Sequence, residues 1–371
     1  MRILILTNYD LGLYKFRREL LEKLIIDEHE VFVCVPDGEY VERIKALGCQ
    51  YVPCDLLDRH GTNPLKELQL LSYYQKLLRD IRPDIVLTYT IKPNAYGGIV
   101  CARAGVPNIA TITGLHGAVE EHGLMQVITL SLYRAGVRNA QRVFFQNKKN
   151  LTFMQKHNIA LHNYALVQGS GVNLRTNCFE PYPQEKERII FLIIGRIVRI
   201  KGTEEILYAA EIVAREHLNV VFRFVGEYEE FDLQSRMEQA VIGGNVEYLG
   251  VQDNVHSLIK NSHATIHASY REGMSNALLE SAAAGRPVLA SNIPGCRETF
   301  DEGVSGIGFE PKNVDDLVRA IKEFIALPHE QKAAMGRAGR EKMEREFDRQ
   351  IVIDAYMREI HIVKENKYGT L

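Results

Sequence analysis

Residues 269–280 read SYREGMSNALLE, and this stretch decides how the second half of the chain is interpreted. It follows an apolar run at residues 264–268 and leads into a mostly apolar segment that ends near Gly285. The pattern predicts a strand, a tight turn at Gly273 and the start of a helix. In open α/β sheets, ligands bind at the carboxyl ends of strands, where the first amides of a helix point free N–H groups outward.

Two carboxylates and a set of amides make this turn a candidate binding site. Glu272 lies just before the helix, and Glu280 lies within the apolar segment. Both are suited to accept hydrogen bonds from sugar hydroxyls, although a solvent-facing helix position is an alternative interpretation of Glu280. The backbone amides of Met274, Ser275 and Asn276 are expected to be unpaired donors in the first turn of the helix.

A second loop with the same placement follows the apolar run at residues 189–194. Its sequence, GRIVRIKG at residues 195–202, places Arg196 and Lys201 between two glycines and ahead of a helical segment. A guanidinium makes forked contacts with phosphate oxygens, an ammonium supplies a point charge, and a helix N-terminus adds partial positive charge. The loop therefore suits a diphosphate, and a solvated basic turn is the alternative.

Short apolar runs alternate with amphipathic segments along most of the chain, as is typical of βα units around parallel sheets. A polar stretch at residues 178–188 interrupts this pattern. We predict an α/β protein with two doubly wound, Rossmann-like domains: residues 1–170 with a C-terminal helix at about 350–371, and residues 171–349. The expected strands are at residues 2–7, 30–35, 84–88, 108–112, 142–145, 189–194, 221–225, 246–249, 264–268 and 287–290, and expected helices include residues 16–26, 65–79 and 124–138.

Composition excludes several classes of protein. A formal net charge of −2 argues against nucleic acid as the main partner, because phosphate binding usually leaves a basic excess. The six cysteines contain no CxxC pair, which indicates reduced thiols rather than a disulfide framework or a zinc site. The start MRILILT lacks the features of a signal peptide, and no apolar run approaches the roughly 20 residues that cross a bilayer. We expect a soluble or peripheral cytoplasmic protein.

The motifs above resemble those of glycosyltransferase family 4, the retaining enzymes with the GT-B fold. The resemblance rests on residues 270–287 and on PGCRET at residues 294–299, and Glu272 and Glu280 match the family's two signature glutamates. GRIVRIKG is similar to its diphosphate loop. YTIKPN at residues 89–94 and TITGL at residues 111–115 resemble a bacterial subgroup that extends lipid-linked sugars, including enzymes that add N-acetylgalactosamine to undecaprenyl-diphosphate-linked bacillosamine. The resemblance covers nearly the whole chain.

The resemblance implies roles for these residues. Arg196 and Lys201 would hold the diphosphate of a nucleotide sugar, with uridine as the implied base, and Glu280 would bind the ribose hydroxyls. Glu272 and the amides from Gly273 to Asn276 would hold the transferred sugar and its phosphates. The family needs no metal or other cofactor, and the chain contains no Asp-x-Asp sequence of the kind that metal-dependent transferases use. We therefore expect a metal-independent hexosyltransferase without a covalent nucleophile.

Two positions depart from the subgroup. His116 stands where the TITGL stretch usually continues with glycine, and Arg271 stands where a histidine is usual. Many members of the family have a histidine near the primary hydroxyl of the transferred sugar, so His116 is a candidate catalytic residue, and a loop-lining role is the alternative. These departures concern which sugar is transferred and leave the reaction class unchanged.

The acceptor is expected to bind the first domain. Residues 122–179 contain seven Lys or Arg and no Asp or Glu. Such a basic, apolar-rich segment is typical of an element that lies on a membrane surface, and a core-packed helix with a solvated basic edge is the alternative. We predict that a lipid-linked glycan binds here, at the cytoplasmic face of the inner membrane, and that Lys15, Arg17 and Arg18 extend the patch towards a lipid diphosphate. The basic residues of the proposed membrane face are Arg134, Arg138 and Arg142, which recur every four residues, with Lys148 and Lys149.

Three other classes remain to be weighed. An NAD-dependent oxidoreductase is disfavoured, because NYDLG at residues 8–12 has one glycine where the dinucleotide loop needs three. A GT-B sugar-nucleotide epimerase or hydrolase shares the fold and would not need the basic stretch. A non-catalytic sugar-nucleotide-binding protein is disfavoured because Arg196, Lys201, Glu272 and Glu280 are all present.

Overall fold

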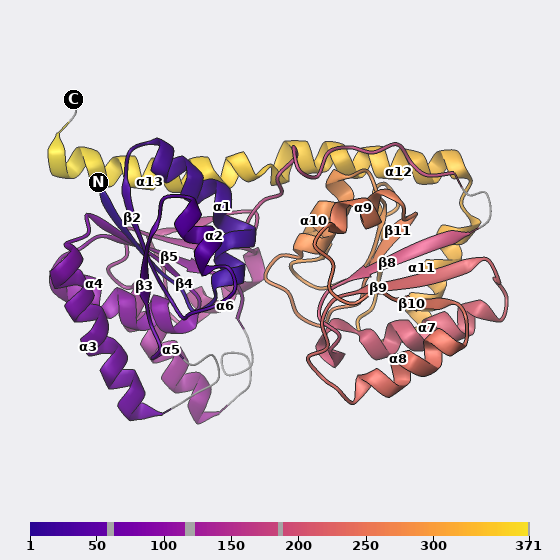
Figure 1. Cartoon of the computed structure of the whole chain (residues 1–371), viewed down its shortest axis with the longest axis horizontal. Coiled ribbons are helices and arrows are strands. Elements are labelled where there is room, and N and C mark those ends of the chain that lie inside the picture. The colour runs from indigo at the N-terminus through magenta and orange to yellow at the C-terminus, as the bar shows by residue number, and fades with distance from the viewer. Residues whose placement is uncertain (58–62, 116–122, 185–187, 370–371) are drawn as a thin grey trace. The chain divides into compact units, whose positions relative to one another are not determined.

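A computed structural model describes residues 1–57, 63–115, 123–184 and 188–369 of the chain. The chain forms two compact units (Figure 1). Unit 1 comprises Met1–Ser170 and Val352–Leu371, and unit 2 comprises Gly171–Ile351. Each unit is built around its own parallel sheet, so the expected α/β class is confirmed.

Unit 1 has seven strands in the order β3-β2-β1-β4-β5-β6-β7. Every pairing is parallel, and Ile3 on β1 lies opposite Val31 on β2 and Ile85 on β4. The order runs outward from β1 in both directions, as in a doubly wound sheet. The strands are β1 (Arg2–Leu6), β2 (Glu30–Val35), β3 (Gln50–Pro53), β4 (Ile85–Tyr89), β5 (Asn108–Ile112), β6 (Arg142–Phe145) and β7 (Tyr164–Leu166).

Helices cover both faces of this sheet (Figure 1). Ile3 and Ile5 pack in one cluster with α1 and α13, whereas Leu4 and Leu6 pack in another with α3 and α4. Successive strand residues point to opposite faces, so a continuous apolar run such as β1 buries both sides. The helices are α1 (Asp10–Ile26), α2 (Val41–Ala46), α3 (Pro64–Ile81), the π-helix η1 (Pro93–Gly97), α4 (Gly98–Ala104), α5 (Leu124–Val137), α6 (Lys148–Lys156) and α13 (Arg349–Tyr368).

The last helix of the chain, α13, completes unit 1. The hydroxyl of Tyr356 lies 2.6 Å from Thr111 Oγ1 on β5. Glu359 accepts a hydrogen bond of 2.7 Å from Arg142 Nε on β6. These contacts attach the C-terminal helix to strands that lie more than 200 positions earlier in the sequence.

Unit 2 repeats the architecture with six parallel strands in the order β10-β9-β8-β11-β12-β13. Its strands are β8 (Ile189–Ile194), β9 (Val220–Val225), β10 (Val246–Tyr248), β11 (Ala264–His267), β12 (Val288–Ser291) and β13 (Gly306–Phe309). Its longer helices are α7 (Thr203–Ala214), α8 (Leu233–Ile242), α10 (Asn276–Ala283), α11 (Val314–Ala326) and α12 (His329–Lys342). Its short helices are η3 (Arg199–Lys201), α9 (Val255–Lys260), η4 (Arg297–Thr299) and η5 (Met343–Phe347).

Three strands escaped the sequence analysis, and all three lie at sheet edges: β3, β7 and β13. β3 and β7 have no fully buried residue, so they lack the apolar run that marks a central strand. β13 is buried, but its sequence GIGF alternates with glycine and has too few apolar side chains to be recognised. The helix α1 also begins earlier than expected, at Asp10 instead of residue 16.

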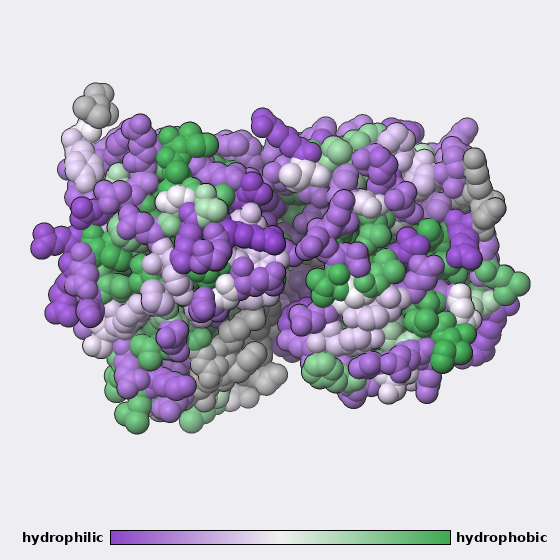
Figure 2. Space-filling model, in the orientation of Figure 1, coloured by the Kyte–Doolittle hydropathy of each residue, from purple (hydrophilic) through white to green (hydrophobic). Residues whose placement is uncertain are grey.

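Separate groups of apolar atoms lie at the lower ends of α3 and α5 in unit 1 (Figure 2). Leu65 and Leu68 on α3, and Leu124 and Val127 on α5, are each more than half exposed. Both helices pack against α4 and η1. Among the described residues, no helix combines the length and the hydropathy that crossing a bilayer requires.

Candidate active site

The motif at residues 269–280 joins β11 to α10. β11 ends at His267, and α10 begins at Asn276 after a turn through Gly273. Ser275 caps the helix, since its side-chain oxygen accepts a hydrogen bond of 3.4 Å from the amide of Leu278. The expected strand, turn and helix are therefore present, and the turn lies at the carboxyl end of a central strand.

Glu272 is held in this turn with only 13% of its side chain exposed. Its Oε1 accepts a hydrogen bond from Lys201 Nζ and lies 2.8 Å from His267 Nε2. Burial alone would raise the pKa of the Glu272 carboxyl, but the charge of Lys201 and the His267 contact outweigh burial and hold that pKa well below its usual range. Glu272 is therefore a carboxylate at physiological pH, and neither contact uses its Oε2.

Lys201 reaches Glu272 because two loops lie against each other. Gly202 has a φ of 73°, and a Cβ there would lie 2.3 Å from the carbonyl oxygen of Ala268. Only glycine allows this approach, which brings the loop at residues 195–202 onto the end of β11. A small pocket is lined by Gly195, Arg196 and Lys201 of the first loop, by Thr203 at the start of α7 and by His267 at the end of β11.

Arg196 lines the same pocket but pairs with a different acid. Its Nη1 lies 2.5 Å from Glu229 Oε2, and both side chains are about half exposed. An exposed ion pair contributes about 0–1 kcal/mol, so Arg196 is able to exchange Glu229 for a phosphate at small cost.

The third cation of the loop, Arg199, is already neutralised. It contacts three carboxylates, those of Glu204, Glu230 and Asp232. Arg196 and Lys201 are therefore the two loop cations that suit a diphosphate.

The structure corrects the prediction for Ser275. Its N–H donates to the carbonyl oxygen of Gly295 at 2.8 Å and is not available to a ligand. Within the described part of the chain, the amides of Met274 and Asn276 make no hydrogen bond, so they remain candidate donors. Gly295 has a φ of 86°, and a Cβ added to it would lie 2.9 Å from Glu272 Cβ. The PGCRET turn therefore packs directly against Glu272.

Glu280 lies on the half-exposed side of α10. Leu278, Leu279 and Ser281 are buried, whereas Asn276 and Glu280 are both partly exposed. Residues four positions apart share one face of a helix, so these two polar side chains lie on the same side. The assignment of Glu280 to ribose stays a prediction.

His267 is a residue of this site that the sequence analysis missed. It is the last residue of β11, and its side chain is 7% exposed. A titratable residue at the carboxyl end of a strand was the available signal. Its meeting with Glu272 depends on the reversal of the chain between them, which residue spacing does not reveal.

Two predicted positions keep no assigned role. His116 lies outside the residues that the structure describes. Arg271 is partly buried and precedes Glu272 in the sequence.

The predicted basic face on unit 1 is wrong in one respect. α5 ends at Val137, and Arg142 lies on β6, where it pairs with Glu359. Arg134 donates a hydrogen bond of 2.6 Å to the carbonyl oxygen of His157. The three arginines therefore do not share a helix face, because the helix does not persist as far as the third.

The fold agrees with comparisons to known proteins. A family profile described as "Glycosyl transferases group 1" matches residues 175–342, and one described as "Glycosyl transferase 4-like" matches residues 2–147. The N,N'-diacetylbacillosaminyl-diphospho-undecaprenol alpha-1,3-N-acetylgalactosaminyltransferase of Campylobacter jejuni is 26% identical over 342 residues, 88% of this chain and 89% of that protein. The lipopolysaccharide core biosynthesis glycosyltransferase LpsE of Rhizobium meliloti is 26% identical over 169 residues, 45% of this chain and 48% of that protein.

Solved structures share the fold across the whole chain. A glycosyltransferase from Rickettsia africae has a TM-score of 0.80 at 16% identity and covers 100% of this chain and 99% of its own. The Anabaena protein HepE, solved in complex with UDP and glucose, has a TM-score of 0.79 at 16% identity and covers 97% and 99%. The chain belongs to the family 4 glycosyltransferases and has the GT-B fold.

Proposed function

We propose that this chain is a retaining, metal-independent glycosyltransferase of bacterial polysaccharide, O-antigen or glycan biosynthesis. It moves a hexose or N-acetylhexosamine from a UDP-sugar to a lipid-linked sugar. The observation that carries the donor side is the buried carboxylate of Glu272, held by Lys201 and His267 beside the first turn of α10. HepE is solved with UDP and glucose, and the name of the Campylobacter relative specifies a diphospho-undecaprenol-linked sugar.

The donor diphosphate is assigned to the loop at residues 195–202 and the start of α10. Lys201 and Arg196 offer two positive charges, and the amides of Met274 and Asn276 offer two N–H donors. Charge grows on the diphosphate as it leaves, so preorganised cations and a helix N-terminus lower the barrier. These groups take the part that a magnesium ion plays in metal-dependent transferases.

The transferred sugar is assigned to Glu272. Its contacts with Lys201 and His267 both use Oε1, so neither of them occupies Oε2. In the proposed step the bond between the anomeric carbon and the diphosphate oxygen breaks, and the acceptor oxygen bonds to the same face of that carbon. The acceptor proton passes to the departing phosphate oxygen. The ionised Glu272 is therefore a hydrogen-bond acceptor for the sugar and no covalent nucleophile is needed.

Arg17 supports an anionic acceptor on unit 1. Its side chain is 5% exposed, and the guanidinium carbon lies 5.5 Å from the ring centre of Tyr89 and 5.6 Å from that of Tyr356. Among the residues that the structure describes, no carboxylate bonds to it. A buried cation without an acid is costly unless an anion binds it, and the diphosphate of a lipid-linked sugar is such an anion.

The exposed end of α5 supports contact with a membrane. Leu124 and Val127 are 75% and 60% exposed, whereas the polar residues Gln126 and Thr129 of the same turns are buried. This reverses the usual arrangement of a surface helix. Lys148 and Lys149, on the next helix α6, are also exposed. Outward-facing apolar side chains and lysines suit the cytoplasmic face of an anionic inner membrane.

The decisive experiment incubates the purified chain with a panel of UDP-sugars and undecaprenyl-diphosphate-linked sugars, and reads the products by mass. We expect one glycosyl unit to be added to the lipid-linked sugar, with the α-configuration of the donor retained. Release or isomerisation of the donor sugar without transfer would instead identify an epimerase or hydrolase. Donor binding without turnover of any acceptor would identify a non-catalytic binding protein.

Metal independence is tested in the same assay. Full activity is expected in excess chelator, because Arg196 and Lys201 supply the positive charge. Loss of activity that magnesium restores would contradict the assignment.

A further inference from the structure

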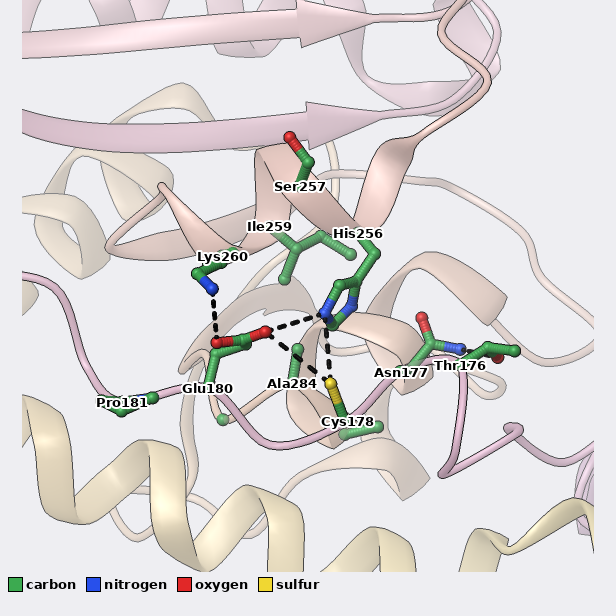
Figure 3. Close-up of polar contacts among 12 residues, drawn as sticks. Thr176, Asn177, Cys178, Glu180, Pro181, His256, Ser257, Ile259, Lys260 and Ala284 are labelled. Atoms are coloured by element: carbon green, nitrogen blue, oxygen red, sulfur yellow. Dashed lines mark hydrogen bonds and ion pairs between the residues drawn. The ribbon is translucent and has the colours of Figure 1, made fainter.

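Three side chains with metal-binding atoms converge in unit 2, outside the loops that form the donor site. Cys178 and Glu180 lie on the segment that precedes β8, and His256 lies on α9 (Figure 3). The Sγ of Cys178 lies 3.6 Å from His256 Nε2 and 3.7 Å from Glu180 Oε1. His256 Nε2 lies 3.3 Å from the same carboxylate oxygen. The three ligand atoms therefore form a nearly regular triangle.

The edges of this triangle match those of a tetrahedral zinc site. Zinc binds sulfur at about 2.3 Å and nitrogen or oxygen at about 2.0–2.2 Å. At tetrahedral angles these bond lengths place nitrogen and oxygen about 3.3 Å apart, and sulfur about 3.5 Å from either. The observed separations are 3.3, 3.6 and 3.7 Å, so shifts of a few tenths of an ångström complete the site.

We propose that Cys178, Glu180 and His256 bind one Zn²⁺ ion, with water as the fourth ligand. Thiolate, imidazole and carboxylate are all common zinc ligands, and the thiolate disfavours calcium and magnesium, which prefer oxygen. The side chain of Cys178 is exposed, so solvent reaches the open position. This site lies outside the proposed donor chemistry and does not depend on it.

A catalytic thiol is the main alternative for these three residues, and the geometry disfavours it. In a Cys-His-acid arrangement the acid holds one ring nitrogen and the thiol faces the other. Here Cys178 and Glu180 both approach Nε2 of His256, and Nδ1 is buried with no hydrogen bond among the described residues. Three ligand atoms that all lie close to one another can bind a single ion, whereas a catalytic triad needs its acid and its thiol on opposite nitrogens of the histidine ring.

The neighbouring chain holds the ligands in place. The guanidinium of Arg286, which is fully buried, donates to the carbonyl oxygens of Glu180 and Pro181 at 2.9 and 3.1 Å. The amide of Glu180 donates to Ala284 O at 3.2 Å, at the end of α10. These bonds fix the backbone of the segment before any ion binds, which lowers the entropic cost of binding.

Lys260 supplies the outer contact that such sites commonly have. Its Nζ lies 3.0 Å from Oε2 of Glu180, which leaves Oε1 to the metal (Figure 3). With a thiolate and a carboxylate as ligands, the two negative charges balance Zn²⁺. An ion here joins the segment before β8 to α9, and the Glu180 amide already ties that segment to the end of α10.

The test uses the reduced full-length chain, stripped of metal and titrated with Zn²⁺ against a chromophoric chelator. We expect one ion per chain, and Cys178→Ser or His256→Ala should weaken binding at least about 10-fold, since even loss of an outer-sphere partner costs 10–100-fold. His217→Ala, a partly exposed histidine elsewhere in unit 2, is the matched control and should bind as the wild type does. Zinc binding that is absent, or equal in all four proteins, overturns the proposal.

Two further readouts separate binding at this site from misfolding. Without metal, Cys178→Ser should melt at the wild-type temperature because Cys178 is exposed. Added Zn²⁺ should raise the melting temperature of the wild type and leave that of the variant unchanged. With Co²⁺ in place of Zn²⁺, the wild type should show a thiolate-to-metal absorption band that the variant lacks. A cobalt complex without that band would exclude Cys178 as a ligand.

Discussion

Replacing Lys201 by methionine should destabilise unit 2 by an amount that depends on pH. Removal of one partner from a buried ion pair costs about 3–5 kcal/mol. The two side chains are 21% and 13% exposed, and His267 still lies 2.8 Å from the same oxygen of Glu272. We therefore expect a loss at or just below the bottom of this range, about 2–3 kcal/mol, at pH 8.

The loss should be smaller at about pH 4. The charge of Lys201 helps to hold the pKa of the Glu272 carboxyl well below its usual range, against the opposing effect of burial. The stability that this ion pair adds is therefore present above the ordinary carboxyl pKa of about 4.3 and is lost as the pH falls. The same substitution made in a Glu272→Gln background should cost less than about 1 kcal/mol at either pH, because the amide needs no cation.

Urea unfolding followed by far-ultraviolet circular dichroism measures these differences, since the chain contains no tryptophan. The four proteins of the double-mutant cycle give the coupling between Lys201 and Glu272 directly. Equal losses in the two backgrounds would refute the reasoning, because Lys201 would then not be compensating a buried carboxylate. A loss that is as large at about pH 4 as at pH 8 would contradict the lowered pKa of Glu272.

Other substitutions separate the remaining roles. Arg196→Ala should change stability by no more than about 0.5–1 kcal/mol, since its ion pair is exposed, but should lower kcat about 100-fold or more by removing charge from the leaving diphosphate. Glu280→Ala should weaken UDP binding in calorimetry without unfolding the chain, because its side chain is partly exposed. Glu272→Gln should make the free energy of unfolding fall less steeply in acid. A carboxyl with a lowered pKa adds stability above about pH 4.3 that is lost as the pH falls, and glutamine has no such group. Leu124→Ser with Val127→Ser should reduce sedimentation with anionic vesicles.

Each of these has a matched control. Arg215→Ala removes an exposed, paired arginine of unit 2 away from the pocket, and a similar fall in kcat there would contradict the role of Arg196. Unchanged UDP binding by Glu280→Ala would exclude its ribose contact. If the free energy of unfolding of Glu272→Gln falls as steeply in acid as that of the wild type, the lowered pKa of Glu272 is contradicted. Ile26→Ser alters a 74% exposed side chain on α1, and an equal loss of vesicle binding would show that the end of α5 is not special.

Local patterns in the sequence were sufficient for the central strands and the two loops. The run at residues 189–194 and the turn at Gly273 are read correctly because each βα unit is contiguous. Edge strands such as β3 were missed because half-exposed residues leave no apolar run. The strand at residues 142–145 was predicted correctly, but the four-residue spacing of Arg134, Arg138 and Arg142 suggested a shared helix face that α5, which ends at Val137, does not provide.

For the candidate site as well, the sequence predicted which residues take part but not all of the contacts that they make. The sequence pattern identified Arg196, Lys201 and Glu272 as polar residues in loops at the carboxyl ends of strands, and Glu280 as an acid within the helix that follows. It did not reveal that the Ser275 amide is taken by Gly295. Nor did the absence of a CxxC pair exclude a metal, because Glu180 and His256 meet across 76 positions.

The family and the fold class follow from the amino-acid sequence, because periodic apolar runs and the SYREGMSNALLE motif are properties of neighbouring residues. The ionisation state of Glu272, the first glutamate of the motif, does not follow from the sequence. Glu272 is a buried anion because Lys201, 71 positions away, and His267 reach the same oxygen. That meeting requires Gly202, in the loop after β8, to lie against Ala268 at the end of β11, a contact that only the folded sheet brings together. Burial and long-range charge set the ionisation of a side chain, and both exist only once the chain has folded.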